Sequence, residues 1–243
     1  MISEDIWAIV PGAGIGKRFG GSFPKQYVNL NGKPIAQHSI ERLVDANLFK
    51  KIIIVIDEND TWFESITLPS YADIEIVFGG DSRAQSVRNG LFSLEGHAMP
   101  NDWVLIHDIV RPLITTAAIK KLFSEVSRKD VAAILATKIN QTVKKTLNDA
   151  GPDKNIIIDK TLNRSRLWEA QTPQIVRYEV LCNALDGCSK SGIDVTDESM
   201  AVEEIGKDVL LIENSPSNIK ITTQDDMLLA EFFSLREFKD LSK

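Results

Sequence analysis

Short apolar runs alternate with segments of helical spacing along most of the chain. Runs that are apolar on both faces predict buried parallel strands at 6–10, 52–56, 74–78, 103–106 and 131–137. Apolar residues that recur every three or four positions predict helices at 35–46, 82–94, 115–126, about 177–189 and 196–205. A last strand is predicted at 209–212 and a closing helix at about 223–235.

Strands that alternate with helices at this spacing favour right-handed crossovers. We therefore expect an α/β fold with an open, mostly parallel, Rossmann-like sheet and helices on both faces. Ligands of such sheets bind at the carboxyl ends of the strands. The loops after Val10, Phe78 and Ile106 are therefore the places where a site is expected.

The alternation breaks between about 138 and 163, where two β-like runs flank turn-forming residues at 148–152. This pattern predicts a β-hairpin arm, inserted into a single domain that spans residues 1–243. A two-stranded hairpin is marginally stable in water when it packs on nothing. We expect the arm to pack on a second copy of the chain, which would make the protein a homodimer.

Composition narrows the set of partners. With 243 residues, 43% of them hydrophobic, the chain can bury the core of one large α/β domain. Its formal net charge of -6 argues against nucleic acid or an anionic membrane as a partner. An anionic ligand would therefore need a local cluster of cations.

Targeting and redox signals favour the cytoplasm. Cys182 and Cys188 lie on one predicted helix, which is a poor geometry for a disulfide and favours a reducing compartment. Acidic residues stand near the amino terminus, where a secretory signal has basic ones. No apolar run approaches the roughly 18 residues of a membrane span. A cytoplasmic protein is expected.

The first strand runs into a glycine-rich loop at 11–27, PGAGIGKRFGGSFPKQY. The Walker pattern would need a glycine at Pro11 and a hydroxyl residue at Arg18. The dinucleotide pattern would need a glycine at Lys17 or Phe19. Neither familiar phosphate-binding motif is therefore present.

What remains is a glycine loop with several cations, Lys17, Arg18 and Lys25. Backbone N–H groups in such a turn can bind phosphate oxygens, and the added positive charge suits a triphosphate. The alternative is a surface turn with solvated side chains, which fits Lys17 best.

An ordered series of motifs resembles the nucleotidyltransferases that join CTP to 2-C-methyl-D-erythritol 4-phosphate in the non-mevalonate isoprenoid pathway. The motifs are the glycine loop, GGDSRAQSV (79–87), HDIVRP (107–112), TLNRSRLW (161–168), QTPQ (171–174), VTDE (195–198) and NIKIT (218–222). The resemblance spans Ile6 to Phe232. It implies a CTP-dependent cytidylyltransferase that releases pyrophosphate.

The resemblance also implies roles for individual residues. It implies catalytic cations at Arg18, Lys25 and Lys220. It implies nucleotide binding by Pro11, Gly12, Ala13, Gly14, Gly16, Gly80, Asp81, Arg83 and Ser86. Finally, it implies polyol phosphate binding by Thr142, Arg164, Thr196 and Lys220. In the family the arm carries the phosphate-binding arginine, here Arg164, into the neighbouring subunit's site.

Asp108 directly follows a predicted strand, and the resemblance implies that it holds Mg²⁺ beside the triphosphate. The alternative is a structural aspartate that caps a helix or pairs with Arg111. For His107 we expect a structural role, because an ionised phosphate nucleophile needs no general base. For Arg83 the alternative to nucleotide binding is a surface ion pair with Asp81.

The sequence departs from the family at several positions. Gly12 stands where the family often has alanine, and Ile109 and Val110 are bulkier than the usual pair. Asn163 and Arg166 replace residues that are commonly aspartate and glycine. The polyol substrate is therefore less firmly implied than the nucleotide.

Three other functions are open to this sequence. A sibling cytidylyltransferase for ribitol 5-phosphate shares the glycine loop and NIKIT, but residues 161–174 look more like the erythritol branch. A non-catalytic nucleotide-binding module would have no need for cations that neutralise a leaving group. A nicotinamide-dependent oxidoreductase is disfavoured by the failed glycine pattern, although Asp57 and Glu58 lie near the end of the second strand.

Overall fold

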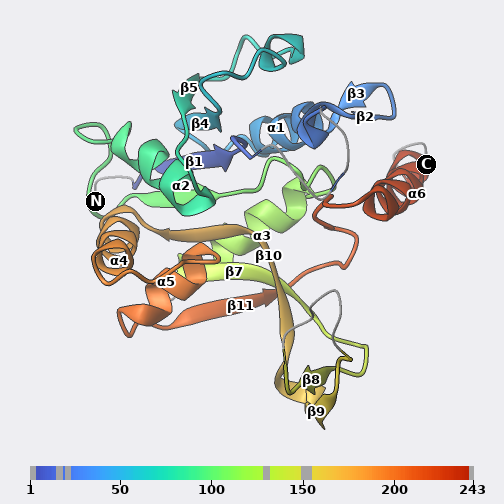
Figure 1. Ribbon diagram of the computed structural model, residues 1–243. Coiled ribbons are helices and arrows are strands. Elements are labelled where there is room, and N and C mark those ends of the chain that lie inside the picture. Colours follow the sequence, from blue (N-terminus) through green and yellow to red (C-terminus); the bar gives the residue numbers. More distant parts are fainter. Residues whose placement is uncertain (1–3, 15–18, 20–22, 128–131, 149–154, 241–243) are drawn as a thin grey trace.

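One mixed sheet organises the chain. The computed structural model describes residues 4–14, 19, 23–127, 132–148 and 155–240. Among them, seven strands form the sheet, in the order β11-β7-β10-β6-β1-β4-β5 (Figure 1). They are β1 (Ile6–Pro11), β4 (Lys51–Ile56), β5 (Ile74–Phe78), β6 (Trp103–Ile106), β7 (Ala132–Lys138), β10 (Trp168–Arg177) and β11 (Val209–Glu213). Among the seven described strands of this sheet, β10 alone runs antiparallel to its neighbours, so the predicted, mostly parallel α/β sheet is confirmed.

Helices cover both faces of the sheet (Figure 1). One face carries α1 (Ile35–Ala46), α3 (Thr116–Val126) and α6 (Gln224–Asp240), which pack into one hydrophobic cluster. The other carries α2 (Arg83–Phe92), α4 (Tyr178–Lys190) and α5 (Glu198–Glu204), which pack into a second cluster. Helix α6 also contacts a small hairpin made of β2 (Asn29–Leu30) and β3 (Lys33–Pro34). The described part of the chain also forms three single helical turns, η1 (Lys25–Tyr27), η2 (Phe63–Ser65) and η3 (Arg164–Arg166).

Local sequence fixes where the helices begin and end. The side chains of Ser82, Thr115 and Asp197 accept a backbone N–H of α2, α3 and α5, respectively, as helix caps do. Helix α1 covers the predicted range and ends at Asn47, whose φ of 51° is left-handed. Two of these caps, Ser82 and Asp197, start the helices that border the candidate site.

The sequence pattern did not predict β10. This strand contains Pro173, which lacks a backbone donor, and its register shifts between Ala170 and Gln174. Gln171 and Gln174 lie within a mixed run that has neither helical nor strand periodicity. Their polar side chains are nevertheless buried, because they bond to neighbouring loops. A sequence pattern does not reveal such partners.

One further prediction about strands was wrong. β5 was expected to be buried on both faces, but it forms an edge of the sheet, and Ile76 and Phe78 are 43% and 58% exposed. Residues 218–222, all of them described, form no strand. The N–H of Ile221 donates to the carbonyl of Val110 at 2.9 Å, which ties this segment to the loop after β6 instead.

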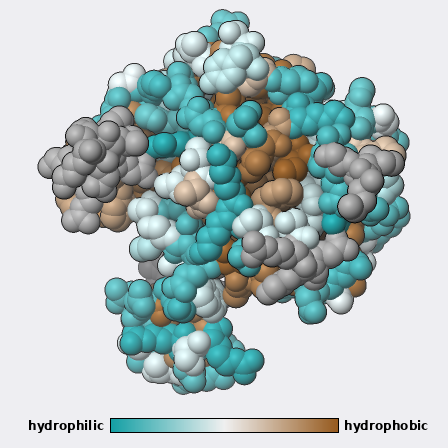
Figure 2. Space-filling model, turned by 180° about the vertical axis from the view of Figure 1, so that it is seen from behind, coloured by the Kyte–Doolittle hydropathy of each residue, from teal (hydrophilic) through white to brown (hydrophobic). Residues whose placement is uncertain are grey.

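The predicted arm is present. β8 (Lys144–Thr146) and β9 (Ile158–Thr161) pair as an antiparallel hairpin that stands clear of the main sheet (Figure 1). Figure 2 shows the arm as a separate lobe with a mostly hydrophilic surface. Its exposed large apolar residues are Leu147 and the three consecutive residues Ile156, Ile157 and Ile158. Among the described residues, no helix combines the length and apolar character that a membrane crossing requires.

Candidate active site

A pocket of about 650 Å³ opens at the carboxyl ends of the parallel strands. The loops that follow β1, β4, β5 and β6 supply most of its wall, as expected for an open α/β sheet. Its lining comprises Pro11–Gly14, Lys25, Gln26, Asp57, Glu58, Gly79–Arg83, Ser86, Asp108–Val110 and Lys220. Residues far apart in the sequence therefore meet around a single cavity.

Most of the predicted nucleotide, metal and catalytic residues line this pocket. They are Pro11, Gly12, Ala13, Gly14, Lys25, Gly80, Asp81, Arg83, Ser86, Asp108 and Lys220. Gly16 and Arg18 lie outside the described residues. Among the described residues predicted to bind the polyol phosphate, Thr142, Arg164 and Thr196 are exposed and lie outside the pocket lining. Arg164 donates instead to the carbonyl of Asn140 at the base of the arm.

Asp108 is surrounded by cations. Its Oδ1 lies 2.9 Å from Nε of Arg83, and its Oδ2 lies 2.8 Å from Nζ of Lys220. Nε of Arg111 is 3.6 Å from Oδ2. Burial alone would raise the pKa of Asp108, but Arg83, Lys220 and Arg111 outweigh it and hold that pKa far below the usual range. The carboxylate is therefore ionised, which metal binding requires.

Arg83 joins two carboxylates instead of pairing with Asp81. Its Nη1 and Nη2 lie 2.6 and 3.0 Å from the two carboxylate oxygens of Glu198, while Nε binds Asp108. Burial favours the neutral guanidinium, but Glu198 and Asp108 together raise the pKa of Arg83 well above its usual value. The predicted alternative, a local ion pair with Asp81, is therefore wrong, because residues distant in sequence provide the partners.

His107 makes a hydrogen-bond chain that fixes its tautomer. Its Nε2 lies 3.2 Å from the carbonyl of Arg111, which can only accept, so Nε2 carries the proton. Nδ1 then accepts the hydroxyl of Thr172 at 3.1 Å, and that hydroxyl in turn accepts the N–H of Asp108 at 3.0 Å. Burial lowers the pKa of His107 to about 4. A neutral, fully bonded imidazole fits the structural role that we expected.

Hydrogen bonds to both the N–H and the carbonyl of Gly12 anchor the glycine loop. The N–H of Gly12 donates to the carbonyl of Val55 at 2.7 Å, and Nε2 of Gln26 donates to the carbonyl of Gly12 at 3.0 Å. Nζ of Lys25 donates to the carbonyl of Ile221 at 2.9 Å, which connects this region to the segment that carries Lys220. The backbone that faces the pocket is therefore held in place.

Gly12 and Ile109, two residues that depart from the family pattern, lie against each other. A Cβ added to Gly12 would lie 2.9 Å from Cδ1 and 3.3 Å from Cγ2 of Ile109, which is buried. Because hydrogen bonds hold the backbone of Gly12, the added atom would have to displace Ile109. The glycine at position 12 and the bulky side chain at position 109 are therefore matched in size.

Gly12→Ala is expected to weaken CTP binding about tenfold, because overpacking costs about 1–3 kcal/mol. Ile109→Ala in the same chain should remove the contacts with Ile109 and restore part of the affinity, because the carbonyl of Val55 still lies 3.3 Å from the added atom. Calorimetric titration of both single variants and the double variant with CTP measures this coupling. Losses that simply add in the double variant would contradict the steric match.

Several residues of the site were not predicted from the sequence. Gln26, which lines the pocket, belongs to the quoted glycine loop, and Glu198, which binds Arg83 from behind the lining, belongs to the VTDE motif, but neither received a role. Asp57 and Glu58 were weighed only for an oxidoreductase. Within the described residues, no cluster of three or more His, Cys, Asp or Glu could hold a metal. A metal bound by Asp108 would therefore take its other ligands from phosphate and water.

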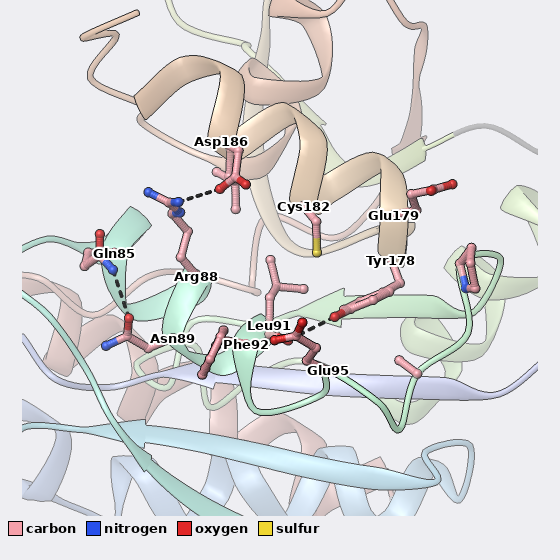
Figure 3. Close-up of a pocket in the computed structure, with 13 residues that line it drawn as sticks. Gln85, Arg88, Asn89, Leu91, Phe92, Glu95, Tyr178, Glu179, Cys182 and Asp186 are labelled. Atoms are coloured by element: carbon pink, nitrogen blue, oxygen red, sulfur yellow. Dashed lines mark hydrogen bonds and ion pairs between the residues drawn. The ribbon is translucent and has the colours of Figure 1, made fainter. Parts of the chain in front are cut away.

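A second hollow, of about 600 Å³, lies between α2 and α4. Figure 3 shows the ion pair between Arg88 and Asp186 at one end of it and Tyr178 at the other. Among the described residues that line it, none was predicted as a site residue. Helix α2 contributes to both hollows, with Arg83 and Ser86 facing the first.

An anchored glycine loop and cations gathered round an ionised carboxylate, at the carboxyl edge of this sheet, are typical of a nucleotidyltransferase. Comparison with known proteins identifies the family. Residues 6–236 match the family described as 2-C-methyl-D-erythritol 4-phosphate cytidylyltransferase, and the chain belongs to it. It is a CTP-dependent cytidylyltransferase of isoprenoid biosynthesis.

Individual relatives match over nearly the full chain. The protein of this name from Alteromonas mediterranea is 39% identical over 98% of this chain and 96% of its own length. The one from Pseudoalteromonas translucida is 41% identical over 93% of this chain and 90% of its own. The crystal structure of the Francisella tularensis enzyme covers 94% of this chain and 99% of its own, with a TM-score of 0.79 and 34% identity.

Proposed function

We propose that the pocket joins CTP and 2-C-methyl-D-erythritol 4-phosphate to give 4-diphosphocytidyl-2-C-methyl-D-erythritol and pyrophosphate. The main observation that supports this proposal is a set of three charged side chains, Arg83, Asp108 and Lys220, which we call the ionic group. It lies beside an anchored glycine loop. The named relatives support the same substrates. Ribitol 5-phosphate, the alternative substrate, is not favoured by these comparisons.

The proposed reaction is an in-line displacement at phosphorus. An ionised oxygen of the polyol phosphate forms a bond to the α-phosphorus of CTP. The bond from that phosphorus to the bridging oxygen breaks, and pyrophosphate leaves with the electron pair. No proton has to move, because the nucleophile is already ionised. The protein's task is therefore to align two anions and neutralise their charge.

The cations would divide this task. We assign Arg18 and Lys25 to the α-phosphate, where negative charge builds up, and Lys220 to the attacking phosphate. The position of Lys220, beside Asp108 and within the same lining as Lys25, supports this assignment. Pro11–Gly14, Gly16, Gly80, Asp81, Arg83 and Ser86 would bind the nucleotide. The bond from the N–H of Gly80 to Oγ of Ser86, 3.2 Å long, supports a fixed contact surface there.

Enzymes of this family generally use a divalent metal ion, and we propose that Asp108 holds Mg²⁺. An ionised carboxylate is the hard oxygen ligand that Mg²⁺ prefers. Arg83 and Lys220 each engage one oxygen of Asp108, which leaves lone pairs on both oxygens for a metal. When bound, the ion would neutralise part of the triphosphate charge.

Pyrophosphate release with CTP and Mg²⁺ is expected to be faster with 2-C-methyl-D-erythritol 4-phosphate than with ribitol 5-phosphate. A coupled pyrophosphate assay that offers each polyol phosphate in turn measures this preference. Faster turnover with ribitol 5-phosphate would contradict the proposed substrate. CTP binding without any product would instead favour a non-catalytic nucleotide-binding module.

We further propose that residues 1–243 form one nucleotidyltransferase domain in which the arm, about 138–163, is an insertion, and that the protein is a cytoplasmic homodimer. The arm would carry Thr142 and Arg164 to the partner's pocket, while Thr196 would act in its own. The exposure of Arg164 away from the pocket of its own chain supports this arrangement. The free thiols of Cys182 and Cys188 support a reducing compartment.

Mixed dimers of Arg164→Ala and Lys25→Ala chains are expected to recover activity that neither variant has alone. Each mixed dimer would hold one intact site and one site that lacks both side chains, so the purified mixed dimers should show about half of the wild-type rate. Co-expression of two differently tagged chains, followed by tandem purification and rate measurement, tests this. Pairing the Lys25→Ala chain with a doubly substituted chain is the matched control, and it should stay inactive. Mixed dimers as inactive as this control would contradict a shared site.

A further inference from the structure

Three buried polar side chains project from the middle of β10. Gln171, Thr172 and Gln174 are 3%, 4% and 1% exposed, although β10 lies between β6 and β7 inside the sheet. They belong to the QTPQ motif, to which the reaction assigns no step. Burying polar groups is unfavourable unless they are hydrogen-bonded, so their partners show what these residues do.

Gln171 holds the segment that leads to Lys220. Its Nε2 donates to the carbonyl of Ser215 at 3.1 Å, and its Oε1 accepts Nδ2 of Asn214 and Nδ2 of Asn218 at 2.8 and 3.1 Å. Asn218 is itself 1% exposed. Lys220 follows two residues later, so the position of its backbone depends on these bonds.

Thr172 holds the loop that carries Asp108. Its hydroxyl accepts the backbone N–H of Asp108 at 3.0 Å and bonds to Nδ1 of His107 at 3.1 Å. Its carbonyl accepts Nδ2 of Asn218 at 2.9 Å. One residue of β10 therefore connects the loop of Asp108 to the segment of Lys220.

Gln174 holds the start of α5, which carries Glu198. Its Nε2 donates to Oδ2 of Asp197 at 3.0 Å, and its Oε1 accepts the N–H of Ser199 at 2.9 Å. These two partners flank Glu198, whose carboxylate binds the guanidinium of Arg83. The direction of Arg83 into the pocket depends on this contact.

We propose that Gln171, Thr172 and Gln174 are positioning residues, each of which sets the place of one member of the ionic group: Lys220, Asp108 and Arg83. This inference rests on the roles proposed above for those three residues. A shift of about 1 Å at a reacting group can lower the rate about a hundredfold. A strand hydrogen-bonded on both sides is a rigid base from which to fix three loops relative to one another.

Near-isosteric substitutions in β10 distinguish a positioning role of these side chains from a role in the stability of the whole fold. Gln171→Met should lower kcat and raise KM for the polyol phosphate, because Lys220 shifts. Gln174→Met should mainly raise KM for CTP through Arg83. Thr172→Val should mainly weaken binding of Mn²⁺, measured by electron paramagnetic resonance with CTP present. Each effect should be about 10–100-fold, as for residues that orient a site group, and Thr172→Ser should restore binding.

Hydrogen exchange tests the same idea without reference to activity. Each variant of the free enzyme should exchange faster in its own loop: 214–222 for Gln171→Met, 107–111 for Thr172→Val and 197–200 for Gln174→Met. If Gln171→Met fails to fold, Gln171→Glu keeps the acceptor and loses the donor. Equal exchange in all three loops, or kinetic losses without any difference among substrates and metal, would overturn the proposal.

Asp102→Asn is the matched control. Asp102 is 4% exposed at the opposite end of β6, where it binds Nε1 of Trp7 and the N–H of Met99, both at 2.9 Å. Its replacement should lower stability without selective exchange in the three loops. If Asp108→Asn and Lys220→Met keep full turnover, the roles proposed for Asp108 and Lys220 in the reaction are wrong. The hydrogen-exchange pattern of the three loops would still decide whether β10 positions them.

Discussion

Asp108→Asn is expected to lower kcat at least about a hundredfold, because the variant loses the charge that would hold the metal and align the cations. The free energy of unfolding should also fall, by about 3 kcal/mol or more, because Arg83 and Arg111 lose a buried partner. Pyrophosphate release and thermal unfolding, measured on the same preparation, test the two effects together.

Glu213→Gln is a suitable control for the charge change. Glu213 pairs with Lys138 at 2.8 Å on an exposed surface, and such pairs contribute at most about 1 kcal/mol. Both activity and stability of this variant should therefore stay close to those of the unchanged protein. Wild-type turnover in Asp108→Asn would refute the role of this carboxylate in the reaction.

Lys25→Ala should lower kcat by about 10²–10³ while the affinity for CTP changes only a few-fold. The reason is that Lys25 is assigned to charge that builds up at the α-phosphate during the reaction, more than to the bound nucleotide. Single-turnover kinetics and calorimetric CTP titration separate the two quantities.

Lys33→Ala removes a similar cation outside the pocket lining, from an exposed pair with Glu41, and should change neither quantity. The opposite result for Lys25→Ala, weak CTP binding with an unchanged rate at saturation, would mean that Lys25 binds the ground state as strongly as the transition state.

Local pattern was sufficient to predict the elements that obey it. Helix α1 matches the predicted range because Ile35, Ile40 and Leu43 repeat at helical spacing and bury the same face. The same reasoning misjudged β5, because an apolar run does not reveal whether a strand has a neighbour on both sides. It missed β10 because the polar side chains of that strand are satisfied only by loops that tertiary folding brings near.

Some residues of the candidate site could also be predicted from the sequence, and others could not. The glycine loop and Asp108 could be predicted, because both directly follow strands and share the carboxyl edge of the sheet. The partner of Arg83 could not, because Glu198 lies on α5, far away in the sequence. Residues of the arm stay a prediction, since their proposed target belongs to a second copy of the chain.

The antiparallel β10 also limits how this site can change in evolution. Loops accept insertions and deletions readily, whereas the insertion or deletion of one residue inside a strand turns the following side chains to the opposite face of the sheet. Residues 139–143 and 193–196 can therefore vary in length, and with them the contacts available to a polyol. The length of β10 cannot vary without moving Gln174 away from α5. New substrates should be sought in libraries that diversify those loops and leave this strand intact.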